Sequence, residues 1–233
     1  MNPLAIIKSF PKDFIFGTAT SSYQIEGSTF GGCGKSHWDS FATKPNATYK
    51  YESGNIACNH IEHWETDLDL IADAGFAAYR FSFSWPRLFT DGKTTKNSQG
   101  FSFYDRLLDG MLDRGILPFA TLYHWDLPQN LADRGGWTNR ETCKWFGDYT
   151  QAIMQAFGDR LHSVATINEP WCVSWLSHYL GHHAPGLQDL ESAARSMHLI
   201  LVAHSNAIEV MRNFNQENIG IVLNKEYMLP ESG

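Results

Sequence analysis

The sequence lacks the features that mark membrane, nucleic-acid-binding and disulfide-stabilised proteins. No apolar run reaches the length of a bilayer span, and the apolar part of MNPLAIIKSF is too short for a signal peptide. Lys and Arg form no cluster, and the formal net charge is -7. The four cysteines form no C-x-x-C pair and are expected to be free thiols. We therefore expect a cytoplasmic protein with neither a nucleic-acid nor a membrane partner.

Motifs for metals, cofactors and nucleophilic serine are also missing. His178, His182 and His183 include an i, i+4 pair, but no H-E-x-x-H occurs, and the glycine and proline residues around them predict a loop. No G-x-S-x-G is present. The glycines at 31–34 lack the G-x-G-x-x-G spacing of a dinucleotide site. We expect neither a metal nor a cofactor.

Aromatic residues, by contrast, are abundant. They make up 14% of the chain and include 8 Trp. An aromatic core is the simpler explanation, but several Trp adjoin polar groups near predicted strand ends, as in His124-Trp125-Asp126. Flat aromatic faces beside hydrogen-bonding groups suit ligands that alternate C–H and O–H surfaces, and sugars are such ligands.

Apolar strands alternate with amphipathic helices along the whole chain. Helix periodicity is clear in the first helical stretch, where Ile61, Trp64, Leu68 and Ile71 recur at spacings of three and four. Repeated strand–helix units with nearly continuous apolar strands indicate a parallel sheet covered by helices. Strands are predicted to start near 14, 77, 116, 163 and 219, and helices are predicted over 61–74, 103–114, 141–157 and 190–213.

Polar residues follow all five predicted strands rather than one glycine-rich turn. They are Gln24, Arg80 with Ser84, His124, Asn168 with Glu169, and Asn224. This distribution predicts a TIM barrel instead of a doubly wound sheet. A closed barrel needs eight strands, and only five fit at this spacing. We therefore expect residues 1–233 to form a single incomplete (β/α)8 barrel domain, the first part of a larger protein.

Glu169 is the first candidate for catalysis. Val164 to Ile167 form a short β-branched run, and Pro170 cannot donate to a strand ladder, so the strand is expected to end just before it. Glu169 then lies at the carboxyl end of a central strand, where α/β folds place their ligands. This position suits a general acid.

Arg80 is the second candidate. Alternation along residues 79–85 places the aromatic side chains on one face and Arg80, Ser82 and Ser84 on the other. The aromatic face suits packing against helices, so Arg80 is expected to point into the barrel. A buried guanidinium needs a partner, most simply a carboxylate. Two interpretations stay open, a bracing salt bridge or a cation that keeps a catalytic carboxylate ionised.

Residues after the first and third strands are weaker candidates when taken alone. A lone His such as His124 is as often a structural residue as a ligand-binding one, but Trp125 beside it favours a hydrogen bond to substrate. Gln24 follows the first strand, where polar residues commonly form turns.

Five segments together resemble the glycoside hydrolase family 1 β-glucosidases. They are FIFGTATSSYQIEG, YRFSFSWPR, LYHWDLP, TINEP and LGHHAPG, in this order, and the resemblance runs from about Phe10 to about Asn224. It implies a (β/α)8 barrel and a hydrolysis that retains the anomeric configuration through a covalent glycosyl-enzyme. It also places His183 in a loop of the family, which favours a structural role over a metal.

The resemblance also implies roles for individual residues. Glu169 matches the general acid/base. Arg80 matches the arginine that pairs with the nucleophile. Residues that match positions hydrogen-bonding the sugar in the −1 subsite are Gln24, His124, Trp125 and Asn168, with Asn224 a looser match.

The family's nucleophile has no counterpart in this chain. It is a glutamate in an I/V-T-E-N-G segment, which is absent here, and retaining hydrolysis needs two carboxyl groups. Glu26 and Asp126 lie near strand ends, but nothing in the sequence places either of them opposite Glu169.

Two hypotheses follow from the missing nucleophile. The chain is either the N-terminal part of a retaining β-glycosidase, inactive or weakly active alone, or a non-catalytic sugar-binding or assembly module. The partners expected are a β-linked sugar and either a chain that carries the C-terminal half or a second copy of this chain.

Overall fold

A five-stranded parallel sheet organises the protein. The computed structural model describes residues 10–225, so the N-terminal segment considered as a signal peptide lies outside the described residues. Neighbouring strands follow the order of the sequence, β1-β2-β3-β4-β5. The strands are β1 (Gly17–Ala19), β2 (Ala78–Ser82), β3 (Leu117–Tyr123), β4 (Ser163–Asn168) and β5 (Ile219–Val222). All five predicted strands are present.

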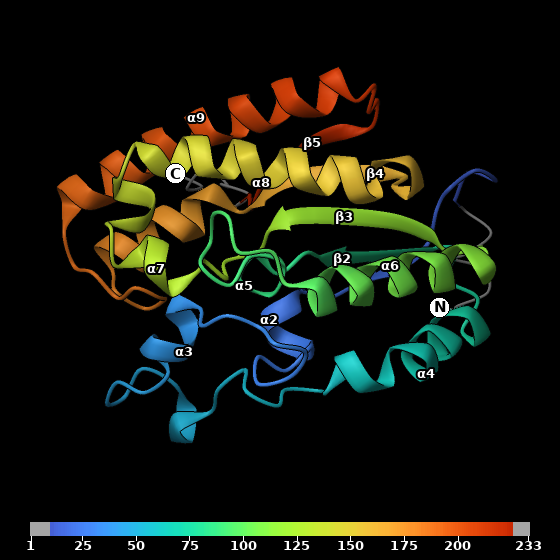
Figure 1. Ribbon diagram of the computed structural model, residues 1–233, viewed down its shortest axis with the longest axis horizontal. Coiled ribbons are helices and arrows are strands. Elements are labelled where there is room, and N and C mark those ends of the chain that lie inside the picture. The colour runs from blue at the N-terminus through green and yellow to red at the C-terminus, as the bar shows by residue number, and fades with distance from the viewer. Residues whose placement is uncertain (1–9, 226–233) are drawn as a thin grey trace, which may run out of the picture.

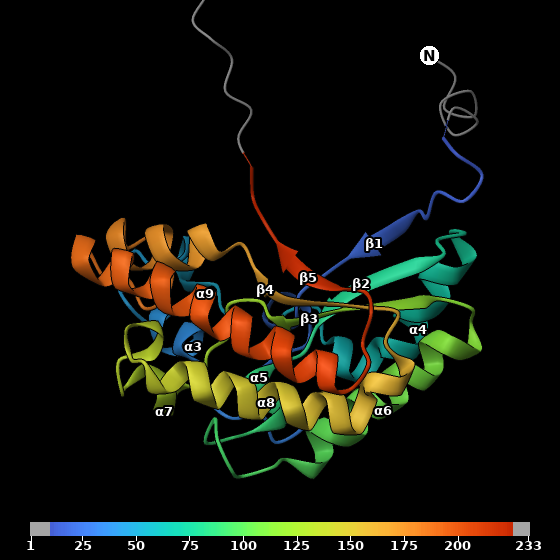
Figure 2. The same ribbon diagram turned by 90° about the horizontal axis from the view of Figure 1, so that it is seen from above.

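The long helices all cover one side of this sheet (Figures 1 and 2). They follow successive strands, as right-handed crossovers between parallel strands require. The long helices are α4 (His60–Asp73), α6 (Ser98–Asp113), α8 (Glu141–Phe157) and α9 (Leu190–Asn213). In the part of the chain that the structure describes, no helix has the length and apolar character needed to cross a bilayer.

The core lies between the sheet and these helices. Tyr79, Phe81 and Phe83 alternate along β2 and its extension, and all three are at most 3% exposed. They pack against α6 and against Phe157 of α8, whose ring stacks on Phe83 at 5.4 Å between centroids. The alternation read from the sequence therefore predicted the buried face of β2 correctly.

Helix ends follow local sequence signals. The Asn97 side chain accepts a hydrogen bond from the Gln99 N–H and caps α6, which starts at Ser98 rather than at the predicted Phe103. The prediction took the first core residue, Phe103, as the start of the helix, whereas the capping residue Asn97 determines where the helix begins. α6 ends before Gly115, which adopts a φ of +68° that glycine tolerates.

The inner face of the sheet carries no covering helix in Figure 2. Arg80 and Phe119 lie on this face as register partners of β2 and β3, and both are partly exposed. Two open hollows of about 560 and 540 Å³ share these two side chains. Within residues 10–225, β1 and β5 form the two edges of the sheet, each paired on one side only.

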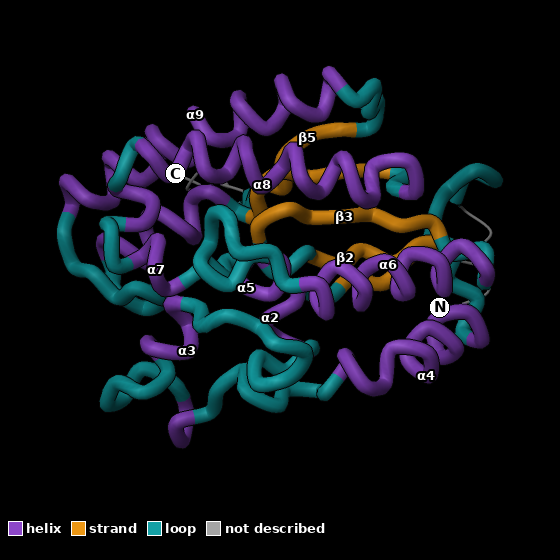
Figure 3. Tube along the Cα trace, in the orientation of Figure 1, coloured by secondary structure: helices purple, strands orange, loops and turns teal. Residues whose placement is uncertain are grey.

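Loops and short helices gather at the carboxyl ends of the strands (Figure 3). Parallel strands all end at the same edge of a sheet, so residues far apart in sequence meet there. The elements are α2 (Ser22–Ile25), α3 (His37–Phe41), η1 (Tyr49–Tyr51), α5 (Trp85–Leu88), α7 (Gln129–Ala132), η2 (Gly136–Thr138) and the π-helix η4 (Cys172–Tyr179), with η3 (Gly158–Arg160) after α8.

Candidate active site

Glu169 directly follows β4, and its backbone is fixed on two sides. Its N–H donates to the carbonyl of Val222 in β5 at 2.8 Å, and its carbonyl accepts from Val173 N–H at 3.1 Å. Its φ is +52°, a left-handed conformation that is uncommon outside glycine. Residues held in such conformations cluster at functional sites. The side chain is half-buried.

Asn168 connects three strands beside Glu169. Its Oδ1 accepts a hydrogen bond from Nη2 of Arg80 at 2.7 Å, and its carbonyl accepts from Nε1 of Trp125 at 2.8 Å. Arg80 Nε also donates to Oγ1 of Thr121 at 3.0 Å. The structure thus brings together the predicted residues at the ends of β2, β3 and β4.

Arg80 faces the open side of the sheet, as predicted. Burial lowers the pKa of its guanidinium, and the charge of Glu169 opposes this shift. Among residues 10–225, no carboxylate forms an ion pair with Arg80. The expected carboxylate partner is therefore not supplied by the described chain, and the amide of Asn168 occupies one fork of the guanidinium instead.

An aromatic wall borders a hollow of about 490 Å³ next to these residues. Trp125 packs against His124 at 5.3 Å and against His183 at 5.0 Å between ring centroids, and Trp38 contacts His183 at 5.5 Å. Gln24 lines the same hollow from α2. Such a surface of ring faces and polar edges suits a sugar.

His124 is held in its neutral form. Burial lowers the pKa of its imidazole to about 4, and the positive charge of Arg80 acts in the same direction. A neutral imidazole carries one N–H donor and one acceptor nitrogen. His124 can therefore exchange a hydrogen bond with a hydroxyl group without adding a charge to the site.

Asn224 is separate from this group. It follows β5 at the same edge of the sheet and is partly exposed. It does not line the hollow, and in the described part of the chain its side chain makes no hydrogen bond to the other candidates. Its predicted contact with sugar stays a prediction.

Sequence reasoning missed three neighbours of the site. Trp38 belongs to the short helix α3 and His183 to the loop after η4, and both line the hollow. Cys172 lies on the first turn after Glu169; burial raises the pKa of its thiol to about 12, and the Glu169 carboxylate adds to this shift. The high tryptophan content was the only signal that pointed to Trp38.

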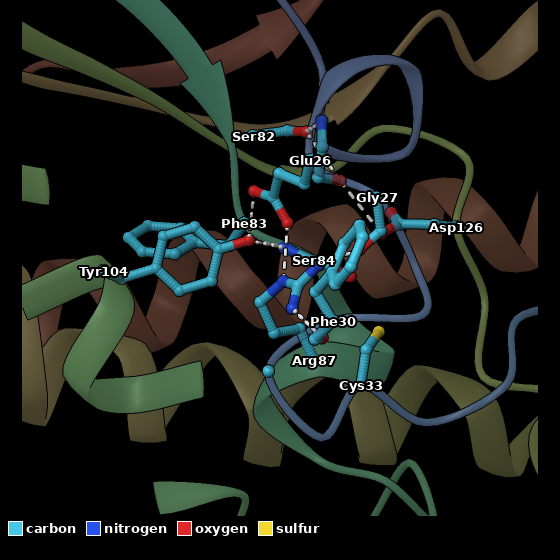
Figure 4. A network of polar contacts seen from close by, with 12 residues as sticks. Glu26, Gly27, Phe30, Cys33, Ser82, Phe83, Ser84, Arg87, Tyr104 and Asp126 are labelled. Atoms are coloured by element: carbon cyan, nitrogen blue, oxygen red, sulfur yellow. Dashed lines mark hydrogen bonds and ion pairs between the residues drawn. The ribbon is translucent and has the colours of Figure 1, made fainter. Parts of the chain in front are cut away.

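Glu26 and Asp126 are engaged elsewhere, so neither replaces the missing nucleophile. Oε2 of Glu26 pairs with Nε of Arg87 at 2.7 Å, and Oε1 accepts from the Tyr104 hydroxyl at 2.7 Å (Figure 4). Asp126 is 1% exposed, and its Oδ2 accepts from the Ser22 hydroxyl at 2.9 Å. Both carboxyl groups belong to a buried network.

The histidines at 178–183 do not converge on a metal site. His178 is buried, and its Nδ1 lies 2.9 Å from the Val173 carbonyl, which only an N–H can satisfy. Within residues 10–225, no group of three or more potential ligands is positioned to hold a metal ion.

Comparisons with known proteins agree with this geometry. Five parallel strands with polar residues at their carboxyl ends are the first five units of a (β/α)8 barrel. The sequence model of Glycosyl hydrolase family 1 matches residues 6–233, and the chain belongs to this family. The resemblance and the fold class predicted from the sequence are thus confirmed.

Relatives and solved structures define the extent of the match. The chain is 48% identical to a β-glucosidase of Agrobacterium sp. over 233 residues, which cover 99% of this chain and 51% of the relative. It is 44% identical to β-glucosidase A of Thermotoga maritima over 228 residues, which cover 97% and 51%. The chain spans about half the length of the curated relatives it matches.

Two solved structures show the same backbone. Virulence factor SghA from Agrobacterium tumefaciens superposes with a TM-score of 0.93 at 48% identity, covering 95% of this chain and 50% of that chain. The Thermotoga maritima β-glucosidase in complex with glucoimidazole gives a TM-score of 0.94 at 44% identity, covering 97% and 52%.

Proposed function

We propose that this chain supplies the acid/base half of the active site of a retaining β-glycosidase that acts on β-glucosides or related β-glycosides. The observation that carries the proposal is the constellation at the end of β4. Glu169 is fixed by β5, and Asn168 beside it is tied to Arg80 and Trp125 at the rim of an aromatic hollow. This arrangement offers a proton donor next to a sugar-sized surface.

Glu169 acts twice in the proposed reaction. Its carboxyl group first gives a proton to the glycosidic oxygen as the C–O bond breaks, and the aglycone leaves as an alcohol. The anomeric carbon meanwhile bonds to the carboxylate of a second glutamate. Water then attacks that carbon, its proton passes to Glu169, and the ester bond to the second glutamate breaks.

The remaining candidates hold the sugar. In this proposal Gln24, His124, Asn168 and Asn224 hydrogen-bond the hydroxyl groups of the sugar. Trp125 contributes its ring face, because its indole N–H already donates to the Asn168 carbonyl. His124 suits the task because its neutral ring both donates and accepts. No cofactor enters the proposed reaction.

In this proposal Arg80 forms an ion pair with the second glutamate. Its guanidinium lies on the inner face of the sheet and has an amide and a hydroxyl as partners. A carboxylate that approached from the open side would form an ion pair with it and stay ionised. The charge of Glu169 alone already acts on Arg80.

The second glutamate must come from outside these 233 residues. We propose that a polypeptide with the C-terminal half of the barrel supplies it. The open edges β1 and β5 and the bare inner face offer it a surface. Phe10, Phe14 and Phe16 form an exposed aromatic cluster before β1, with centroids 4.5 to 5.1 Å apart. A second copy of this chain fits less well because it brings no I/V-T-E-N-G segment.

The proposed location is the cytoplasm. All four cysteines are free thiols, and two of them, Cys143 and Cys172, are buried. A reducing compartment keeps thiols in this state.

The test is an aryl β-glucoside assay on the 233-residue chain, alone and mixed with a C-terminal half taken from a related β-glucosidase. We expect little or no hydrolysis by the chain alone and hydrolysis by the mixture. Glu169→Gln is the matched control and should silence the mixture. Turnover by the chain alone near the rate of a whole enzyme, lost in Glu169→Gln, would overturn the need for a second half.

Light scattering on the same samples distinguishes the two candidate partners, a C-terminal half and a second copy of this chain. A mass of one chain that rises to a one-to-one complex with the C-terminal half supports the proposal. A stable dimer of this chain that hydrolyses the substrate by itself would favour the second copy.

A non-catalytic sugar-binding module is the rival function. The aromatic hollow favours it, because the described residues alone form that surface. Calorimetry with glucose distinguishes the two. Binding by the chain, together with no hydrolysis by any mixture with a C-terminal half, would favour the module.

A further inference from the structure

A chain of buried hydroxyl and carboxyl groups runs beneath the aromatic hollow. The Ser22 N–H donates to Oγ of Ser82 at 2.8 Å, and the Ser82 hydroxyl donates to Oγ of Ser22 at 3.1 Å. The Ser22 hydroxyl in turn donates to Oδ2 of Asp126 at 2.9 Å. Ser82, Ser22 and Asp126 belong to β2, α2 and the segment after β3, so the chain joins three strand ends.

Two members of this hydrogen-bonded series, Ser22 and Asp126, adjoin the proposed sugar contacts in the sequence. Ser22 precedes Gln24 by two residues in the single turn of α2, and Asp126 directly follows His124 and Trp125. α2 has four residues and no side-chain cap at Ser21. A helix this short has no stability of its own, so tertiary bonds must fix its position.

The other end of α2 is held by an ion pair. Glu26 and Arg87 are 5% and 1% exposed, and Arg87 also donates to the carbonyls of Gly27 and Phe30 at 2.9 and 2.7 Å (Figure 4). Arg87 is therefore saturated by Glu26 and the backbone. Asp126 has no cationic partner in the described residues, and its Oδ1 is buried without a hydrogen-bond partner there.

We propose that Ser22 and Asp126 are positioning residues that set Gln24 against His124 and Trp125, and that Asp126 does so as an uncharged carboxylic acid. The functional meaning of those three contacts rests on the proposed function. The positioning itself rests only on the hydrogen bonds of the chain Ser82–Ser22–Asp126.

The surroundings favour the uncharged form. Burial raises the pKa of Asp126 to about 8, against the opposing hydrogen bond of the Ser22 hydroxyl, and the negative Glu26 raises it further. Burial also raises the pKa of the Cys33 thiol to about 12. The titratable or charged groups facing Asp126 are Tyr23, Glu26, Cys33, Arg87, Tyr123 and Tyr149.

Asp126 is then the group of this set that changes charge between pH 7 and 9. The pKa values of the three tyrosines and of Cys33 are all raised by burial, so these groups stay neutral. Glu26 and Arg87 remain paired. Ionisation of Asp126 would leave a buried carboxylate with no cation, which is costly unless the surrounding contacts loosen.

The experiment is a nitrogen–proton NMR titration of the 233-residue chain from pH 6 to 9. The reporters are the Trp125 indole N–H, which donates to the Asn168 carbonyl, and the side-chain amide of Gln24. We expect both signals to shift with a midpoint near pH 8. Asp126→Asn should abolish this shift and keep the low-pH positions, because an amide has the shape of the neutral acid.

Ser22→Ala is the second variant and should displace both signals at every pH, because it breaks the link between α2 and Asp126. The matched controls are Asp113→Asn and Ser98→Ala on exposed positions of α6, which should leave both signals in place. Signals that ignore pH in the unmodified chain, or that stay in place in Ser22→Ala, would overturn the proposal. The titration uses neither sugar nor hydrolysis. Its outcome is therefore independent of whether the proposed enzymatic function is correct.

Discussion

Arg80 on β2 donates a 2.7 Å hydrogen bond to the side chain of Asn168, the residue that precedes Glu169 on β4. The bond crosses β3, where Arg80 also holds Thr121. One guanidinium therefore spans three strands and fixes the residue beside the proposed acid. It also places a positive charge on the open inner face, where a second carboxylate is required.

Arg80→Met should lower the free energy of unfolding by about 1–3 kcal/mol, because Asn168 loses a charged donor in a largely buried place. In the mixture with a C-terminal half, it should also lower the rate of hydrolysis. Arg80→Lys should recover only part of both, because a lysine lacks the planar fork that reaches two acceptors. Urea unfolding and the aryl β-glucoside assay measure the two effects.

Arg106→Met is the matched control for that substitution. Arg106 is exposed and contacts the Ser102 hydroxyl at 3.1 Å. Its loss should change stability by about 0.5 kcal/mol or less. Equal effects of the two substitutions would contradict the bracing role of Arg80.

Glu169→Gln in the mixture should slow hydrolysis most for substrates with poor leaving groups. An alkoxide or a simple phenoxide needs a proton as it departs, whereas dinitrophenolate leaves without one. We expect a loss of roughly 10²–10⁴-fold with a methyl β-glucoside and a much smaller loss in the first step with a dinitrophenyl β-glucoside. Equal losses for both substrates, measured by steady-state and burst kinetics, would argue that Glu169 does not act as the acid.

Glu26→Gln should destabilise the chain by about 3–5 kcal/mol, because it leaves Arg87 buried without its counter-ion. The ion pair is 5% and 1% exposed, so water cannot replace the lost partner. Asp69→Asn is the control, since Asp69 pairs with Arg114 at a site where the side chains are 60% and 25% exposed. That loss should stay at or below about 1 kcal/mol in urea unfolding. A similar loss in both variants would mean that burial does not govern the pair.

Hydrophobic periodicity predicted the helices and strands well, because the spacing of apolar residues reflects which face of each element is buried. The helices predicted at 141–157 and 190–213 have those limits in the structure. The first strand was predicted from Phe14 but is paired only from Gly17. Phe14 and Ile15 are 47% and 44% exposed, so their apolar character does not reflect a core position in this chain.

The site was predictable where it lies on strands or directly follows them. Arg80 and Glu169 follow from strand alternation and from the position of Pro170. Trp38 lies on the five-residue helix α3 and His183 in a loop, and the two side chains meet only through a tertiary contact. No period in the sequence encodes such contacts, and the left-handed backbone of Glu169 depends on β5 rather than on its own residue type.

Buried His37 should make the chain less stable as the pH drops from about 6.5 toward 4. Burial lowers its pKa to about 3, and the charges of His178 and Lys44 act in the same direction. Below pH 6.5 the unfolded state binds a proton that the folded state refuses, so stability declines by about 1.4 kcal/mol per pH unit for this one group. Urea unfolding at pH 7 and pH 4.5 measures the decline.

His37→Asn isolates this contribution, because it keeps a polar side chain but removes the titration. Asp126 acts with the opposite sign: its raised pKa means that the folded state holds an extra proton between about pH 4 and 8, so its contribution to stability falls as the pH rises. The informative quantity is therefore the difference between variant and unmodified chain at each pH. That difference should change with pH for His37→Asn. A constant difference for His37→Asn would show that the folded state accommodates a charged imidazole at this position.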